Sequence, residues 1–358
     1  MCDEERIDGQ LWNCFVALRE SRPQEMAELV ATVDERNTSI WLASLARGLK
    51  GWLAARGERR DPLRLQRRFD LPVVNTQNCE LWFDAQGNTE RRDHDPDSFL
   101  TTQVACEYQP DAKCPEWDRF CSLIFNECSD PEGMQRHLEE LGGYAISMSR
   151  WLKTWVMLQG PKDTGKSTLT EVLNSMLEDA ALSMDLGRFG DKSNQFTNTG
   201  LVGKLILVDD DFAKRSMLPD GFLKTISEEK SLSTEKKFGD VFRFICRALP
   251  IICSNHWPKT SDLSDALRER ALVFPFYHKI AGHERSDRRR TAMLKELPGI
   301  LNRFLAGLSR LRERGDWDVP VDCLEAKSQW IKHSNIVALF ANQCLQREEH
   351  TALPGKKA

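Results

Sequence analysis

The stretch Gly160-Pro-Lys-Asp-Thr-Gly-Lys-Ser-Thr168 decides the fold of this chain. It matches the phosphate-binding pattern GxxxxGK[ST] in full, with an apolar run before it at 155–158 and helically spaced apolar residues after it at 169–177. Glycines let backbone N–H groups wrap around phosphates, and the N-terminus of the following helix adds the positive end of its dipole. The stretch therefore predicts a strand, a phosphate-binding loop and a helix in succession.

Two side chains of this stretch would carry the chemistry of a nucleoside triphosphate site. Lys166 would reach the β- and γ-phosphates, and the hydroxyl of Ser167 would coordinate Mg²⁺. The predicted nucleotide-binding residues are Gly160, Pro161, Lys162, Asp163, Thr164, Gly165, Lys166, Ser167 and Thr168.

Further apolar runs follow the loop at 204–208, 249–254 and 272–275. Each is four to eight residues long and rich in β-branched or large apolar residues, as the buried strands of a parallel sheet are. Helical patterns lie between the runs, which predicts an α/β nucleotide-binding layout. Before the loop, helical spacing covers 1–60, and short extended segments surround a turn signal at 84–88.

Polar residues follow two of these runs. Asp209, Asp210 and Asp211 come 43 to 45 residues after Lys166, where one carboxylate would hold Mg²⁺ and a neighbour would polarise the attacking water. Such a run can also cap a helix, and spacing does not assign the roles. Asn255 ends the next run and would lie beside the γ-phosphate, although a lone asparagine there is usually a turn residue.

Two basic elements complete the pattern. Arg268 and Arg270 precede the last apolar run, and either could reach a neighbouring subunit's γ-phosphate or form a surface ion pair. The segment 232–244 alternates around a turn and predicts a β-hairpin with Lys236, Lys237 and Phe238 near its tip. Cations beside an aromatic ring suit a nucleic-acid strand, and lysines also protect edge strands.

Taken in this order, the elements resemble the superfamily 3 helicases, most closely the phage/plasmid primase and poxvirus-type primase-helicase family. The flanks are similar as well, at Leu71-Pro-Val-Val-Asn75, Tyr108-Gln-Pro110, Gly143-Tyr144 and Leu297-Pro-Gly299. The resemblance covers about 65–345. It departs from the family at Ser227-Glu-Glu-Lys230, and the acidic residue that aligns with the family's could be Asp211 rather than Asp209.

The resemblance implies an α/β fold with a P-loop (AAA+-like) ATPase core, a mainly helical N-terminal domain and a helical C-terminal segment. The implied domains are a helical region at 1–64, a helicase-adjacent N-terminal domain at 65–148, the ATPase domain at 149–280 and the C-terminal segment at 281–358.

The implied activity is that of an ATP hydrolase and DNA helicase in replication of a phage, plasmid or integrated element. It would form a hexameric ring on single-stranded or forked DNA and use ATP and Mg²⁺. Its implied catalytic residues are Lys166, Asp209, Asp210, Asp211, Asn255, Arg268 and Arg270; Ser167, Asp209 and Asp210 would hold Mg²⁺, and Lys236, Lys237 and Phe238 would bind DNA. We expect no primase or polymerase domain ahead of residue 1, so that any priming would come from a separate primase or polymerase chain.

Composition limits the alternatives. The formal net charge of −4 over 358 residues excludes a globally basic DNA-coating protein, although a local basic channel remains compatible. No apolar run approaches the roughly 18 residues of a membrane helix and the N-terminus is acidic, so we expect a cytoplasmic protein of a bacterial or virus-infected cell. A replication initiator or helicase loader with little unwinding of its own is the main alternative. A P-loop kinase is another, but it would leave Asn255 and the basic hairpin unexplained.

Overall fold

The computed structural model describes residues 69–98, 100–189, 195–212, 217–235, 241–262, 265–282 and 286–334. The chain divides into two compact units, 1–64 and 65–358. The helical region predicted at 1–64 lies outside the described residues, and so does the end of the chain from 335. The domain boundaries predicted after 148 and 280 fall inside the second unit and stay predictions.

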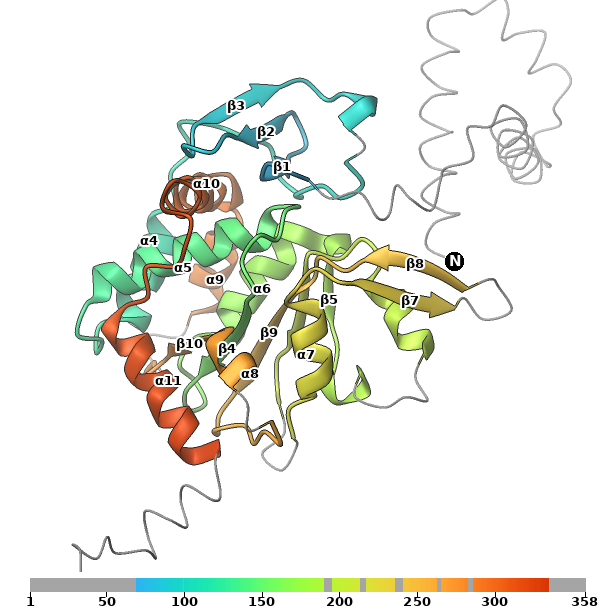
Figure 1. The fold of residues 1–358 in the computed structure, drawn as a ribbon. Helices are drawn as coiled ribbons and strands as arrows, with labels where there is room; N and C mark the ends of the chain where they lie inside the picture. The colour runs from blue at the N-terminus through green and yellow to red at the C-terminus, as the bar shows by residue number, and fades with distance from the viewer. Residues whose placement is uncertain are drawn as a thin grey trace, which may run out of the picture. The chain divides into compact units, whose positions relative to one another are not determined.

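A parallel five-stranded sheet forms the centre of this unit (Figure 1). Its spatial order is β10-β4-β9-β6-β5, and every neighbouring pair is parallel. The strands are β4 (Trp155–Gln159), β5 (Ala181–Ser183), β6 (Ile206–Asp209), β9 (Leu249–Ser254) and β10 (Ala271–Pro275). The predicted α/β class is confirmed, and four of these strands coincide with the four apolar runs.

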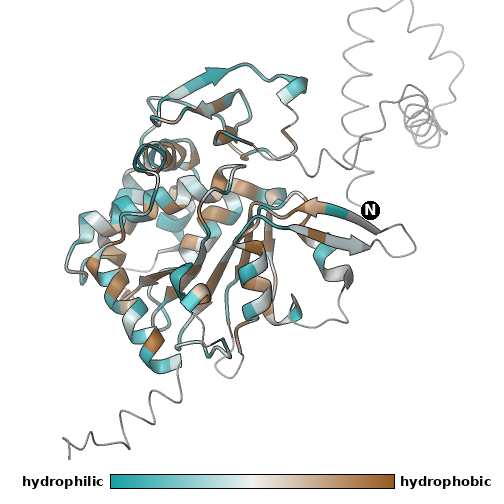
Figure 2. Cartoon of the chain, in the orientation of Figure 1, coloured by the Kyte–Doolittle hydropathy of each residue, from teal (hydrophilic) through white to brown (hydrophobic). Residues whose placement is uncertain are grey.

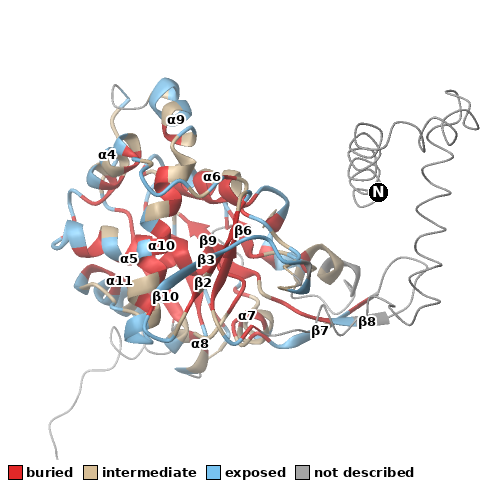
Figure 3. Cartoon of the chain, turned by 90° about the horizontal axis from the view of Figure 1, so that it is seen from above, coloured by how far each residue is buried: buried red, intermediate tan, exposed pale blue. Residues whose placement is uncertain are grey.

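The strands of the sheet consist mostly of hydrophobic residues, as Figure 2 shows by their brown colour. In β4, Val156 and Leu158 belong to one hydrophobic core, and Trp155 and Met157 belong to another. Successive side chains of a strand point to opposite faces, so each core covers one face of the sheet. Burial on both faces explains why these runs are continuously hydrophobic rather than alternating (Figure 3).

Helices supply the rest of both cores. Side chains of one set of helices join the core of Val156 and Leu158: α4 (Pro115–Ile124), α5 (Pro131–Ile146), α6 (Lys166–Leu177), α9 (Asp287–Leu294) and α10 (Leu297–Arg314). A second set contributes to the core of Trp155 and Met157: α7 (Asp220–Ile226), α8 (Asp265–Glu269) and α11 (Val321–Ser334). Among the residues that the structure describes, short 3-10 helices lie at Pro96–Ser98, Glu178–Ala180, Leu186–Phe189 and Gln195–Leu201.

A small antiparallel sheet precedes α4. It consists of β1 (Val73–Asn75), β2 (Glu80–Phe83) and β3 (Thr89–Arg92), in the order β1-β2-β3. The turn predicted at 84–88 connects β2 and β3, and Gly87 adopts φ +79° in it. The described part of the predicted N-terminal domain is therefore mixed rather than mainly helical, because its extended segments at 71–75 and 81–83 pair with one another.

Helices α5 and α10 pack closely, because glycines remove side chains from their contact. A Cβ on Gly143 would lie 2.7 Å from the Leu308 Cβ, and a Cβ on Gly307 would meet the backbone of Glu139 and Glu140. Ion pairs flank the contact, with Arg310 Nη2 at 2.8 Å from Glu139 Oε2. This interface joins residues before the phosphate-binding stretch to residues after the sheet.

The guanidinium group of Arg150 fastens the C-terminal end of α5 to the sheet. It donates to the carbonyl oxygens of Tyr144, Ala145, Ser147, Ser149, Leu205 and Arg247 over 2.5–3.2 Å. A cation is favourable at a helix C-terminus, where carbonyl groups lack partners within the helix. Arg150 thereby links α5 to the residues that precede β6 and β9.

The predicted hairpin is present as β7 (Ser231–Glu235) and β8 (Val241–Ile245), which pair antiparallel from Ser231 opposite Ile245 to Glu235 opposite Val241. In Figure 1 this two-stranded ribbon extends away from the central sheet. Its tip at 236–240 lies outside the described residues. None of the helices in the described part of the chain is both long and apolar enough to cross a membrane.

Candidate nucleotide-binding site

The predicted phosphate-binding stretch forms the connection between β4 and α6. Gly165 adopts φ +95° immediately before the helix, and Asp163 also has a positive φ of 69°. Gly160 packs so closely on Phe276 that a Cβ there would lie 2.9 Å from the Phe276 Cβ. The close approach to Phe276 at Gly160 and the positive φ at Gly165 both require glycine, as the sequence pattern predicts.

Lys166 is the first residue of α6, and its side chain is folded into the loop. The ammonium nitrogen donates to the carbonyl oxygens of Gly160 at 2.7 Å and Pro161 at 2.6 Å, and lies 3.3 Å from Thr164 Oγ1. Burial lowers the pKa of this lysine, while the charge of Asp163 opposes that shift. Ser167 is exposed beside it, and Thr168 is half-buried.

The sheet order brings the predicted polar residues to one edge. Strand β9 lies between β4 and β6, and all three are parallel. Gln159, just before the loop, lies opposite Ser254, just before Asn255; Asp209 lies opposite Ile252. The loop, Asn255 and the aspartates therefore follow the carboxyl ends of three adjacent strands, where ligands bind in open α/β sheets.

The three aspartates occupy different environments. Asp209 ends β6 and is 5% exposed, and its Oδ2 accepts a hydrogen bond of 2.9 Å from the Leu186 N–H. Burial raises the pKa of Asp209, and the backbone N–H groups of Leu186 and Asp211 oppose the increase. Asp210 and Asp211 are exposed. Only Asp209 is thus held rigidly by the strand.

Cys253 lies beneath this edge and was not anticipated as a site residue. Its thiol is 1% exposed, and burial raises its pKa to about 12, with opposing or reinforcing effects from the charges of Lys166, Asp210 and Asp209. The pKa of this one buried thiol is thus affected by charges of both the loop and the acidic strand. Its position two residues before Asn255 was the only signal in the sequence.

The described residues contain no group of three or more His, Cys, Asp or Glu side chains placed to hold a metal ion. The Mg²⁺ site expected from Ser167, Asp209 and Asp210 is of another kind, since phosphate oxygens and water supply most ligands of Mg²⁺ in nucleotide sites. The donor types fit that chemistry: a hydroxyl at the start of α6 and oxygens at the end of β6.

Helix α4 also reaches the loop, which the sequence patterns did not indicate. A Cβ on Gly165 would lie 2.8 Å from Ile124 Cγ2 and 3.1 Å from Phe120 Cε2. A contact between residues more than 40 positions apart leaves no periodic signal in a single sequence.

Arg268 and Arg270 lie at the opposite edge of the sheet. Ala271 begins β10 and lies opposite Trp155, the first residue of β4, and the Trp155 N–H donates to the Arg270 carbonyl over 2.9 Å. At about 3.3 Å per residue, the five residues of β4 separate this edge from the phosphate-binding loop by roughly 16 Å. Neither arginine belongs to the site formed by Lys166, Asp209 and Asn255.

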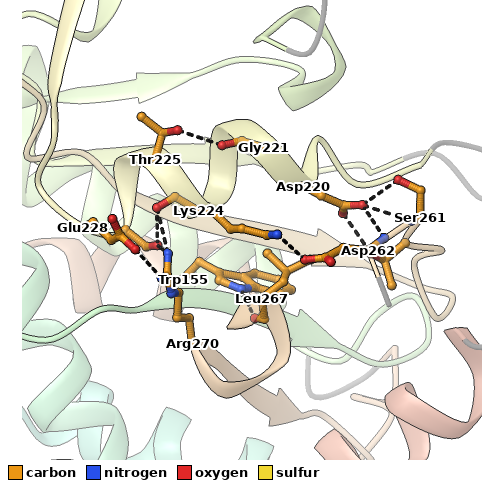
Figure 4. Close-up of polar contacts among 12 residues, drawn as sticks. Trp155, Asp220, Gly221, Lys224, Thr225, Glu228, Ser261, Asp262, Leu267 and Arg270 are labelled. Carbon is orange, nitrogen blue, oxygen red and sulfur yellow. Dashed lines mark hydrogen bonds and ion pairs between the residues drawn. The ribbon is translucent and has the colours of Figure 1, made fainter. Parts of the chain in front are cut away.

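The two arginines differ in their contacts. Arg270 forms an ion pair with Glu228 and donates to the Lys224 carbonyl over 2.8 Å, as Figure 4 shows. Hydrogen bonds from Lys230 and Arg270 lower the pKa of Glu228 to about 2. Arg268 lies 3.6 Å from Asp265, and its Nε and Nη2 have no hydrogen-bond partner within the described part of the chain.

The same region connects α7 to the loop that follows Asn255. Asp220 accepts hydrogen bonds from Thr260, from Ser261 and from the backbone of Asp262, over 2.8–3.0 Å. Lys224 pairs with Asp262 at 2.6 Å (Figure 4). Helix α7 thus contacts both the Asn255 loop and Arg270.

The predicted DNA-contacting residues Lys236, Lys237 and Phe238 lie outside the described residues. The strands that lead to them are placed, but the side chains at the tip stay predictions.

Comparison with known proteins gives two family matches. Residues 66–126 match the family described as D5 N terminal like, and residues 158–270 match a family of unknown function, DUF5906. No curated protein matches the chain. Two apo structures of the NrS-1 C terminal region are similar at 14% identity: one has a TM-score of 0.49 and covers 77% of this chain and 76% of that chain, the other 0.46, 74% and 72%.

The matches fall where the resemblance placed its parts. The D5 N terminal like match covers the segment expected to be the helicase-adjacent N-terminal domain, and the second match runs from β4 to Arg270. The two family matches thus support the resemblance of the chain to primase-helicase families.

Proposed function

We propose that this chain is the ATPase motor of a superfamily 3 DNA helicase, with an AAA+-like core, acting in replication of a phage, plasmid or integrated element. The order of β4, β9 and β6 carries the proposal, because it places a phosphate-binding loop, an amide and carboxylates side by side. A small-molecule kinase would need the loop, but not Asn255 between the loop and the acidic strand.

In this function the residues at the carboxyl edge divide the work. Lys166 leaves the carbonyl oxygens of its own loop and binds the β- and γ-phosphates. Asn255 orients the attacking water beside the γ-phosphate. Asp209 and Asp210, at the end of the neighbouring strand β6, would hold Mg²⁺ and polarise the attacking water.

Ser167, Asp209 and Asp210 would hold Mg²⁺. When bound, Mg²⁺ neutralises charge on the β- and γ-phosphate oxygens. The Leu186 N–H that donates to Asp209 Oδ2 would hold this carboxylate in place for the ion.

The arginines require a neighbouring subunit. Arg268 and Arg270 lie roughly 16 Å from the loop of their own chain, so either could reach a γ-phosphate only across an interface between copies. Head-to-tail interfaces close into rings, and a hexamer is the ring we propose. Arg268 is the better candidate because two of its nitrogen atoms lack partners in the described residues, whereas Arg270 is held by Glu228.

The β7–β8 ribbon would carry the DNA contacts. Lys236, Lys237 and Phe238 at its tip would face the ring channel, where the lysines neutralise phosphates and the ring stacks on a base. Only these tips need be basic, which agrees with a net charge of −4.

The test is steady-state ATP hydrolysis by the full chain, with and without single-stranded DNA, at two salt concentrations and with Lys166→Ala as the blank. We expect DNA to stimulate hydrolysis and salt to weaken the stimulation. A rate of hydrolysis that is the same with and without DNA would contradict the proposed motor function. Stimulation by DNA without strand displacement would favour a helicase loader.

A further inference from the structure

A cavity of about 250 Å³ adjoins the phosphate-binding stretch on the side of α4 and α9. Its lining includes Thr168, two residues after Lys166, together with side chains of α4 and α9 and the segment that follows β10. Cavities that take up whole ligands measure about 300–1,000 Å³, so this one suits part of a ligand whose remainder lies outside it.

We propose that this cavity holds the base and ribose of the nucleotide, so that α4 and α9 determine which nucleoside triphosphate the site accepts. The inference rests on the proposed function, because it takes the phosphates to be bound by the loop. It assigns base recognition to residues outside the phosphate-binding pattern.

Three separate contacts fix the cavity walls to the loop. Helix α4 packs on Gly165 through Ile124 and Phe120. The Ile280 N–H donates to the Asp163 carbonyl over 2.8 Å. Helix α9 is tied to α6 by Arg290 Nε, which lies 2.8 Å from Glu171 Oε2. The cavity therefore keeps its position relative to the phosphate site.

The lining has the chemistry that a flat, polar-edged base requires. Phe120 is half-buried, so part of its ring remains accessible, and Met293 and Ile280 add apolar surface. Arg119 and Arg289 are exposed at the rim and can stack on a base or donate to its edge and to ribose oxygens. Base stacking on an aromatic side chain tolerates different bases, whereas arginine donors discriminate among acceptor patterns.

The walls also come from different parts of the chain. Phe120 and Arg119 lie within the D5 N terminal like match, Thr168 lies within the second match, and α9 lies beyond both. A complete nucleotide site thus requires the D5 N terminal like segment in addition to the P-loop core.

The experiment compares ATP with inorganic tripolyphosphate, which has the phosphates but no nucleoside. Binding of both probes is measured by calorimetry on the full chain, for the unaltered protein and for Phe120→Leu, which removes the ring but keeps an apolar side chain facing Gly165. Loss of the stacking ring should weaken the affinity for ATP about tenfold. The affinity for tripolyphosphate should stay within about twofold of that of the unaltered chain. Ser122→Ala is the control, since Ser122 is exposed on the same helix and does not line the cavity.

Arg119→Ala is the second variant, because Arg119 is exposed and its removal leaves the packing of α4 intact. We expect it to change the ratio of ATP to GTP, CTP and UTP affinities severalfold, with tripolyphosphate again unaffected. The cavity assignment is overturned if ATP and tripolyphosphate bind the unaltered chain equally well, or if the variants weaken both alike or neither. Failure of the proposed function is a different result, in which the unaltered chain binds neither probe or Lys166→Ala retains hydrolysis.

Discussion

Lys166 and Pro161 are joined by a hydrogen bond of 2.6 Å inside the phosphate-binding loop. The ammonium group of Lys166 thus binds carbonyl oxygens of its own loop. Any phosphate that enters must take over these bonds, since a buried ammonium group without a partner is unfavourable.

Replacement of Lys166 by alanine should abolish nucleotide hydrolysis, with a loss of about 10³-fold or more in turnover. It should also remove the rise in melting temperature that ATP gives the unaltered chain. Lys332→Ala, an exposed change on α11, is the control and should retain both properties. Turnover that survives in Lys166→Ala would remove the loop from the catalytic site.

Substitutions of the three aspartates should lower kcat to different extents, depending on their position after β6. We expect Asp209→Asn and Asp210→Asn each to lower kcat about 100-fold or more, because β6 ends at Asp209 beside the strand that leads to Asn255, and Asp210 follows directly. Asp211→Asn should lower kcat less than about fivefold, because Asp211 is exposed and lies two residues beyond the end of β6. If kcat fell only in Asp211→Asn, the essential carboxylate would be Asp211 rather than Asp209, which is the alternative alignment with the family.

Subunit mixing tests the arginines. Arg268→Ala and Lys166→Ala chains should each be inactive, and mixtures should recover part of the activity, since some interfaces then contain both intact groups. Arg270→Ala should instead lower the melting temperature, because it leaves Glu228 with only Lys153 and Lys230 as cationic partners and the Lys224 carbonyl without this donor. Recovery in mixtures with Arg270→Ala, and none with Arg268→Ala, would reverse the assignment.

Arg150 should be a major contributor to stability. Removal of its guanidinium group leaves buried carbonyl oxygens without donors, so we expect Arg150→Ala to lower the free energy of unfolding by about 4 kcal/mol. Arg136→Ala is the matched control, because the ion pairs of Arg136 with Asp130 and Glu132 are exposed and worth about 0–1 kcal/mol. Chemical denaturation compares the two, and equal effects would contradict the role given to Arg150.

His137 should make stability sensitive to acid. It is 1% exposed and stacks on Phe274 at 4.7 Å, and burial lowers its pKa to about 3. The unfolded chain binds this proton near pH 6.5 and the folded chain does not, so stability falls as the pH drops from about 6.5 toward 3. His137→Phe should reduce the slope of unfolding free energy by up to about 1.4 kcal/mol per pH unit in that window. An unchanged slope would mean that His137 is protonated in the folded state.

Much of the central sheet could be predicted from the sequence, because β4, β6, β9 and β10 are buried on both faces and appear as continuous apolar runs. Strand β5 could not, since Ala181-Leu-Ser183 is too short and too polar to stand out. Hydrophobic patterns also say nothing of strand order, so only the structure places Asn255 between the loop and Asp209.

The candidate site likewise combines features that the sequence predicts with features that it does not. The phosphate-binding loop has a local signature, because its backbone conformation demands glycines at fixed spacing. The packing of Phe120 on Gly165 and the partners of Arg270 depend on contacts between distant parts of the chain. A single sequence contains no trace of such contacts.

The shared core has a consequence for how the proposed motor would move. Phe83, Tyr144, Val156, Phe274 and Leu308 belong to one continuous hydrophobic cluster, so the D5 N terminal like segment and the sheet with its phosphate loop are built around the same interior. A hinge between them would have to break that interior open. Any power stroke would therefore swing the whole body of the subunit against its neighbours, with the β7–β8 ribbon as the lever arm.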